Sequence, residues 1–230
     1  MISFWLMNKA LSISGQQRFV EEGYHSFAQN LKNFDDYDVF IHTWEDEEST
    51  HDIQIYKPCR LLVDTPIDFN YDNIHYPMFY SIKQSLDLVA SYPKKYDCVI
   101  RTRFDAFLED EIDVELFPLE EGVYSPDVCG NPAVISDWFN FGNYKNMMMY
   151  TEIYDNITQY GESGVNITSG EELICHHLRE INNVELIKVQ NKSILLIRSD
   201  DFQNLHNTRR RVSDLPSLNK SKSKLETVSY

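Results

Sequence analysis

The residues best suited to chemistry lie in the segment YDCVIRTRFDAFL, within which we place a strand over 97–104. Arg101, Arg103 and Asp105 are two positions apart, so an extended backbone turns all three side chains to one face. Two guanidinium groups beside a carboxylate suit a phosphate bound together with a divalent metal ion. A surface strand with a local salt bridge is the alternative, but the preceding run CVI is typical of a buried strand.

Two earlier strands lead into further candidate ligand-binding residues. The strand expected over 10–14 stops at Gly15, which is followed by Arg18, and the strand over 37–43 leads into Trp44. A glycine between a strand and a helix lets the backbone turn sharply and leaves amides free for an anion. Ligands of parallel sheets lie beyond the carboxyl ends of the strands. We therefore expect these residues and the arginine–aspartate segment to converge on one rim.

The elements that position these residues alternate between strand and helix. In the first half we expect strands over 10–14, 37–43, 53–56, 59–63 and 97–104, with helices over 16–33 and 77–91. In the second half we expect short strands over 112–114 and 123–125, helices over 143–160 and 171–182, and a closing pair of strands over 184–189 and 193–197. This order predicts an α/β domain with a mostly parallel central sheet flanked by helices.

The charge of the chain changes near its end. The 230 residues carry a net charge of −15, yet six of the 21 lysines and arginines lie in residues 207–230. We expect one domain over 1–206 and a basic, mobile tail over 207–230. The acidic balance argues against broad nucleic-acid binding and against docking on an anionic membrane.

The cysteines and the first residues bear on the compartment. The four cysteines, at 59, 98, 129 and 175, are far apart and lack metal-finger spacing, so we expect free thiols in a reducing, cytoplasmic setting. The opening MISFWLMNKALSIS is too short to span a membrane and lacks the features of a signal peptide. Met7 offers a second natural start, which would make 1–6 an extension.

Several blocks in order resemble a known family. LSISGQQR, YDVFIHTW, MFYSIKQSLDL and YDCVIRTRFDAFL are similar to GT-A-fold glycosyltransferase-like proteins of bacterial surface-polysaccharide loci and large viruses. SDWFNFGN and EELICHHL extend the resemblance over about 8–200. It implies a single GT-A-like, Rossmann-like domain. It also implies transfer of a sugar from a nucleotide-diphosphate donor to a glycan or lipid-linked acceptor hydroxyl, in polysaccharide or glycan synthesis.

The resemblance further implies a divalent metal, Mn²⁺ or Mg²⁺, held on the donor diphosphate by an Asp-x-Asp element. Here RFD stands in that place, so one carboxylate is replaced. Either Asp105 holds the metal, with His206 completing its shell by analogy and His42 as a weaker alternative, or Arg101 and Arg103 neutralise the diphosphate instead. The donor-binding residues expected on this basis are Gly15, Arg18, Trp44, Arg101, Arg103 and Asp105.

An inverting reaction also needs a general base. Asp137 is the first candidate, because it lies in an aromatic segment that ends at a glycine; the alternative is a turn or cap residue. Glu171 and Glu172 come second, and the alternative for them is charge that complements a helix dipole. Trp44 would stack on the donor base or fill the core.

Two other functions fit the same sequence. A non-catalytic nucleotide-sugar or glycan-binding domain would explain the incomplete Asp-x-Asp element. A nucleotidyltransferase shares a sheet of this kind, but it usually carries a glycine-rich, basic stretch after the first strand. The segment GQQR has only one glycine and one cation, which disfavours a nucleotidyltransferase.

Overall fold

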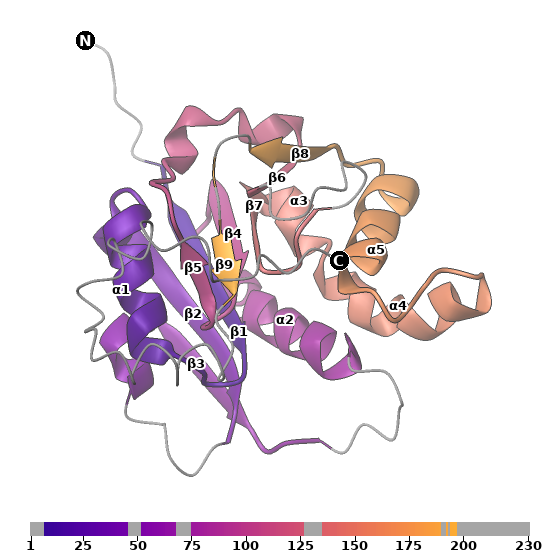
Figure 1. Cartoon of the computed structure of the whole chain (residues 1–230), viewed down its shortest axis with the longest axis horizontal. Helices are drawn as coiled ribbons and strands as arrows, with labels where there is room; N and C mark the ends of the chain where they lie inside the picture. Colours follow the sequence, from indigo (N-terminus) through magenta and orange to yellow (C-terminus); the bar gives the residue numbers. More distant parts are fainter. Residues whose placement is uncertain are drawn as a thin grey trace, which may run out of the picture.

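The computed structural model describes residues 7–45, 52–67, 75–126, 135–189, 192 and 194–196. Its centre is a seven-stranded sheet in the order β3-β2-β1-β4-β7-β6-β8 (Figure 1). The strands are β1 (Lys9–Gly15), β2 (Tyr37–Trp44), β3 (Arg60–Asp64), β4 (Cys98–Thr102), β6 (Val123–Pro126), β7 (Phe139–Asn143) and β8 (Leu186–Val189). Strands β1 to β4 are parallel, β7 is antiparallel to both β4 and β6, and β8 is parallel to β6. The predicted α/β architecture with a mostly parallel sheet is confirmed.

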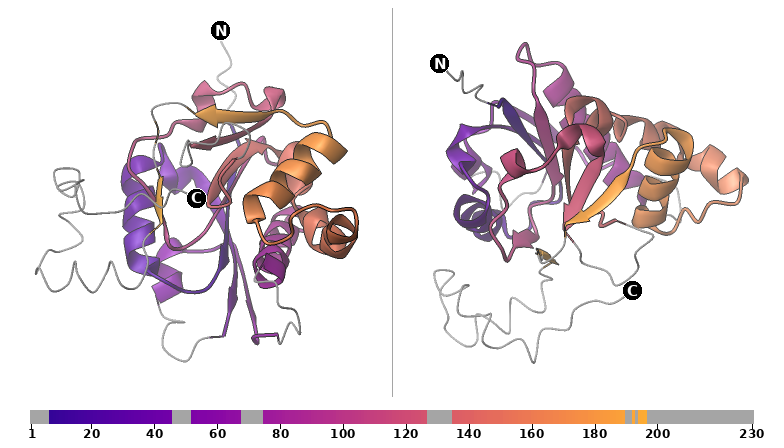
Figure 2. Two further views of the ribbon diagram at one scale, coloured as in Figure 1. Left: turned by 45° about the vertical axis from the view of Figure 1, so that its right-hand side comes forward. Right: turned by 90° about the horizontal axis from the view of Figure 1, so that it is seen from above.

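Helices lie on both faces of this sheet. They are α1 (Val20–Asn30), α2 (His75–Ala90), α3 (Tyr144–Met148), α4 (Thr151–Glu162) and α5 (Gly170–Cys175), which continues as a π-helix, η5 (His176–Ile181). Helix α1 lies on one side of the sheet, and α2, α4 and α5 lie on the other (Figure 2). Among the described residues, no helix is long and apolar enough to cross a membrane.

The strands are apolar on both faces because both faces are covered. In β1, Leu11 and Ile13 pack in the cluster that includes Phe27 of α1, whereas Ala10 packs in the cluster of the α2 face. Helix α2 buries a stripe at helical spacing, made of Phe79, Ile82, Leu86 and Val89. A strand buried on both sides reads as a near-continuous apolar run, which is why β1, β2 and β4 were predictable.

The strand order creates a switch point between β1 and β4. The chain adds β2 and β3 on one side of β1 and then adds β4 on the other side. Loops that leave β1 and β4 therefore diverge, and crevices for ligands form at such points. Strand β7 runs in the opposite direction, so its first residue, Phe139, pairs with Thr102 at the end of β4. The segment before β7 thus lies at the same rim as the carboxyl ends of the parallel strands.

Two predicted strands are wrong. The segment expected as a strand over 53–56 is a 3₁₀-helix, η2 (Asp52–Tyr56), which buries Ile53 and Tyr56 three positions apart, as a 3₁₀ turn requires. In the segment expected over 112–114, Ile112 forms an isolated parallel bridge with Leu31. The chain then turns into a 3₁₀-helix, η3 (Val114–Leu116), and a second one, η4 (Leu119–Glu121), follows.

Both predicted closing strands form, as β8 and β9 (Ile194–Leu196), but the prediction that they pair with each other is wrong, because they belong to different sheets. Strand β8 extends the main sheet beside β6, and β9 pairs with the short strand β5 (Ala106–Leu108), which was not predicted. Such long-range pairings have no local signature. The basic tail over 207–230 lies outside the described residues.

Three predicted helices differ in extent. Helix α1 begins only after Phe19, which adopts a left-handed conformation (φ 55°), and the short 3₁₀-helix η1 (Phe34–Asp36) follows it. The helix expected over 143–160 is divided into α3 and α4. The helix expected over 171–182 changes to π-helical pairing, in which the Asn182 amide donates to the His177 carbonyl.

Candidate functional site

Arg101 lies under the rim, where a ligand has no access to it. The side chain on β4 is fully buried, and its Nη1 donates to the main-chain oxygen of Asp137 and, at 3.4 Å, to Asn140 Oδ1. Burial lowers the pKa of Arg101 to about 10, although the nearby charge of Asp137 opposes this shift. The structure therefore assigns Arg101 to the support of the rim, in contrast to the donor contact expected from the sequence.

Arg103 and Asp105 neutralise each other. Strand β4 ends at Thr102, earlier than the predicted strand over 97–104, so the alternation of side chains along the strand does not extend to these residues. Arg103 Nε donates to Asp105 Oδ1 at 2.8 Å and Nη2 donates to Oδ2 at 2.9 Å. Both carboxylate oxygens of Asp105 thus accept from one guanidinium, whose side chain is 26% exposed against 7% for the aspartate.

This pairing bears on the metal expected from the resemblance. A divalent cation of this class needs several oxygen ligands, and both oxygens of Asp105 already accept hydrogen bonds. Within the described part of the chain, no group of three or more histidine, cysteine, aspartate or glutamate residues is arranged to hold a metal ion. His206 lies outside that part. The described residues therefore do not fit the expected metal site.

Two predicted base candidates, Asp137 and Glu171, belong to one cluster. Asp137 lies two residues before β7 and is 6% exposed. A Cβ atom added to Gly170, the first residue of α5, would lie 3.2 Å from Asp137 Oδ2 and 3.4 Å from His75 Nδ1 of α2. Burial raises the pKa of Glu171, and the charge of Asp137 raises it further. Carboxyl groups 34 positions apart in sequence thus interact at the starts of α2 and α5.

The segment that carries Asp137 is held firmly. Thr102 Oγ1 donates to the Trp138 carbonyl at 3.2 Å, and Asn140 Nδ2 donates to the Ser136 carbonyl at 2.9 Å. The Trp138 amide donates to Ser136 Oγ at 3.0 Å. Asp137 Oδ1 is buried and accepts no hydrogen bond from the described residues. A buried carboxylate oxygen without a hydrogen-bond partner is uncommon and calls for an explanation, such as a role in a site.

Glu172, the third base candidate, lies apart from this cluster. Its side chain is exposed and accepts from Asn166 Nδ2 at 3.2 Å, while its amide donates to Ser169 Oγ at 3.2 Å. Ser169 is the N-cap of α5. Glu172 is therefore part of the helix start, which was the alternative given for it.

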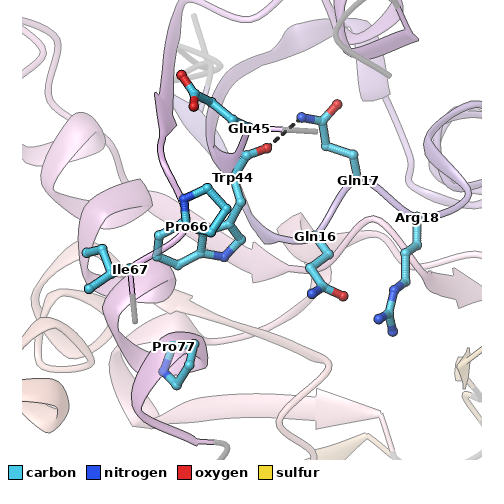
Figure 3. A pocket seen from close by; sticks show the side chains of 8 residues that line it. All are labelled: Gln16, Gln17, Arg18, Trp44, Glu45, Pro66, Ile67 and Pro77. Carbon is cyan, nitrogen blue, oxygen red and sulfur yellow. Dashed lines mark hydrogen bonds between the residues drawn. The ribbon is translucent and has the colours of Figure 1, made fainter. Parts of the chain in front are cut away.

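A cavity of about 460 Å³ opens at the carboxyl ends of β1, β2 and β3 (Figure 3). It is lined by Gln16, Gln17, Arg18, Trp44, Glu45, Pro66, Ile67 and Pro77. Gln17 Nε2 donates to the Trp44 carbonyl at 2.9 Å, which joins the loops after β1 and β2. Gly15 has a φ of +115°, which lets the chain turn at the end of β1. The volume of the cavity falls within the range usual for small-molecule sites.

The first turn of α2 connects the cavity with the carboxyl cluster. Pro77 lines the cavity, and His75, two positions earlier, lies near Gly170 and Asp137. The same turn therefore borders both. His75 and Gly170 were not predicted as site residues. A glycine at a helix start signals a cap, but its close approach to Asp137 is a tertiary contact with no local signal.

Comparison with known proteins identifies neither a family nor a function for this chain. No protein-family model matches this chain, and a search of the curated proteins finds no significant match. The site is therefore described from the residues of this chain alone.

Proposed function

We propose that this protein is a glycosyltransferase that moves a sugar from a nucleotide-diphosphate donor to an acceptor hydroxyl. One observation carries the proposal. A cavity at the carboxyl ends of β1 to β3 and a pair of interacting carboxyl groups beside β4 both border the first turn of α2. Donor binding and proton removal can then occur side by side.

The cavity suits the nucleoside end of the donor. The indole of Trp44 and the rings of Pro66 and Pro77 offer apolar surface to a planar base. The exposed side-chain amide of Gln16 supplies both a donor and an acceptor for its edge. This combination of apolar walls with a few polar groups is typical of small-molecule sites.

A cation that lines the cavity suits the diphosphate. Arg18 is exposed and lines the cavity, whereas Arg103 shares its charge with Asp105. Arg18 is thus the better placed of the two to stabilise negative charge on the leaving nucleoside diphosphate. The sequence also suggested that Arg101 and Arg103 neutralise the diphosphate. Arg101 cannot contact it, because that side chain is wholly buried.

Asp137 suits the general base. In an inverting transfer, the acceptor hydroxyl gives its proton to Asp137 while its oxygen bonds to the anomeric carbon. The bond between that carbon and the diphosphate oxygen breaks at the same time. Asp137 Oδ1 has no hydrogen-bond partner among the described residues, and burial together with the charge of Asp137 raises the pKa of the neighbouring Glu171.

A non-catalytic nucleotide-sugar or glycan-binding domain is the second candidate. The ion pair of Arg103 and Asp105 favours it, because the element expected to hold a catalytic metal is neutralised within the chain. Such a domain would use the same cavity and would leave the donor intact.

Two measurements separate these functions. Thermal denaturation with a panel of nucleotide sugars, with and without Mn²⁺, should raise the melting temperature for at least one donor, because a ligand at 100 times its Kd stabilises by about 2.7 kcal/mol. Release of nucleoside diphosphate from that donor then indicates transfer. Binding without any release would favour the binding domain, and no shift with any donor would refute both.

A further inference from the structure

A hydrogen-bonded network lies directly behind the cavity wall formed by Trp44. His42, two positions earlier on β2, shares a hydrogen bond of 2.6 Å between its Nδ1 and Ser81 Oγ of α2. Its Nε2 lies 3.1 Å from Oδ2 of Asp64, the last residue of β3. The same oxygen accepts from the hydroxyl of Tyr80 on α2 at 3.0 Å. One carboxylate thus links three elements.

The rings of this network pack on the indole. Trp44 stacks on Tyr80, with centroids 5.5 Å apart and planes 23° from parallel. The ring of His42 meets the indole edge to face at 5.1 Å, and Tyr154 of α4 meets Tyr80 in the same manner at 5.4 Å. Asp64 fixes the polar ends of the two rings that contact Trp44, so the indole has little freedom to turn.

Two further residues on the Trp44 side of the cavity lie close to Asp64 in sequence. Pro66 and Ile67, which line the cavity, follow Asp64 by two and three positions. The main-chain oxygen of Asp64 also accepts from the amide of Glu45 at 2.8 Å, next to Trp44. Figure 3 shows Trp44, Pro66 and Ile67 together on one side of the cavity.

The order Ser81–His42–Asp64 matches the hydrogen-bond order of a hydrolase triad, but its placement excludes that chemistry. Ser81 and His42 are 1% and 0% exposed, so no substrate reaches the serine oxygen. Both ring nitrogens of His42 have partners within the chain, which also disfavours the metal-ligand role considered for this histidine in the sequence analysis. The network therefore acts on its neighbours and not on a substrate.

We propose that His42, Asp64 and Tyr80 are positioning residues that fix Trp44 as a preformed wall for the aromatic base of a nucleotide. The inference rests on the proposed function for the identity of the ligand. A ring that is already immobile loses no further freedom when a base packs on it, which strengthens binding. None of the hydrogen bonds and ring contacts described above joins the network to Arg18, the residue proposed to bind the diphosphate, so we expect its effect to be specific to the base.

The test compares ligands that have a base with one that lacks it. Isothermal titration calorimetry measures the affinities of the uridine, guanosine, adenosine, cytidine and thymidine diphosphates and of inorganic pyrophosphate. Tyr80→Phe keeps the stacked ring and removes one hydroxyl, and Asp64→Asn weakens both hydrogen bonds to the carboxylate. Tyr160→Phe is the matched control, because it removes a hydroxyl that bonds a buried histidine, His177, on another element.

We expect Tyr80→Phe and Asp64→Asn to weaken the best nucleoside diphosphate by about 3- to 10-fold and to leave pyrophosphate within twofold. Tyr160→Phe should change neither. Equal losses for both ligand types, or no loss for the nucleotide, would overturn the inference. If Asp64→Asn does not fold, Tyr80→Phe alone decides. A wild-type protein that binds none of these diphosphates would refute the proposed function, and this inference with it.

Discussion

Arg101 Nη1 donates a hydrogen bond to the main-chain oxygen of Asp137, which lies 36 positions further along the chain. A fully buried cation within β4 therefore anchors the segment that carries the proposed general base. Thr102, the next residue of β4, anchors the carbonyl of Trp138 in the same segment. The position of the base is thus set by the central sheet, as precise catalysis requires.

Replacing Arg101 tests this anchoring role. Arg101→Met should lower turnover at least tenfold, because Asp137 loses a main-chain anchor, and should change nucleoside diphosphate affinity less than twofold. Steady-state kinetics and calorimetry measure the two effects. Arg179→Met, which removes an arginine that is 43% exposed, is the control. A large loss of affinity with turnover preserved would instead assign Arg101 to the donor.

Gly170 controls the space around Asp137. In Gly170→Ala, the new Cβ would lie 2.9 Å from Met78 Cε and 3.2 Å from Asp137 Oδ2, and both are ends of side chains that can move. We expect turnover to fall about 10- to 100-fold as the carboxylate shifts, with a loss of stability of about 1 kcal/mol. Urea unfolding and kinetics on the same variant measure both quantities. Unchanged turnover would show that the carboxylate position is not critical.

The framework of this site was predictable, but its assembly was not. Strands β1, β2 and β4 are apolar runs that end in Gly15, Trp44 and the arginine segment, so a rim was evident from the sequence. Asp137 and Glu171 were each predicted, but as alternatives. Their proximity arises where α5 approaches the segment before β7, and this contact depends on tertiary packing.

The errors have physical causes of the same kind. Arg103 and Asp105 were assigned to the face of Arg101 because the periodicity of charged residues continued past the strand. Strand β4 ends at Thr102, where β7 begins to pair with it, and the chain then turns. Beyond that point Arg103 and Asp105 form an ion pair with each other. No sequence pattern marks where a strand loses its partner.

The ion pair of Arg103 and Asp105 should be energetically coupled. Arg103→Met leaves a carboxylate that is 7% exposed without its bidentate partner. We expect a loss of about 1–3 kcal/mol, below the cost for a fully buried pair because the arginine is partly exposed. In a urea double-mutant cycle with Asp105→Asn, the double variant should lose less than the sum of the single losses. Additive losses would contradict the coupling.

His177 should make the protein less stable in mild acid. The ring is buried, which lowers its pKa from the ordinary 6.5, although the charge of Glu152 at 3.8 Å opposes this shift. Its Nδ1 also bonds the Tyr160 hydroxyl at 2.6 Å. The unfolded chain therefore binds a proton more readily than the folded protein, and stability should fall as the pH decreases below about 6.5.

Melting temperatures between pH 7.5 and pH 5 measure this slope. His177→Gln should flatten it, whereas His25→Gln, which changes a histidine that is 49% exposed, should not. Burial also lowers the pKa of His42, so part of the slope should remain in His177→Gln. A slope identical to that of the wild type in His177→Gln would contradict the prediction.

The most direct test of the proposed function is the release of nucleoside diphosphate from nucleotide sugars by the wild type, by Asp137→Asn and by Glu172→Gln. General base catalysis contributes about 10²- to 10⁴-fold, so Asp137→Asn should lose that factor in turnover while it retains donor affinity. Glu172→Gln, which changes an exposed helix-start residue, should keep wild-type turnover. Equal turnover by the wild type and Asp137→Asn, or no release from any donor that binds, would contradict the account.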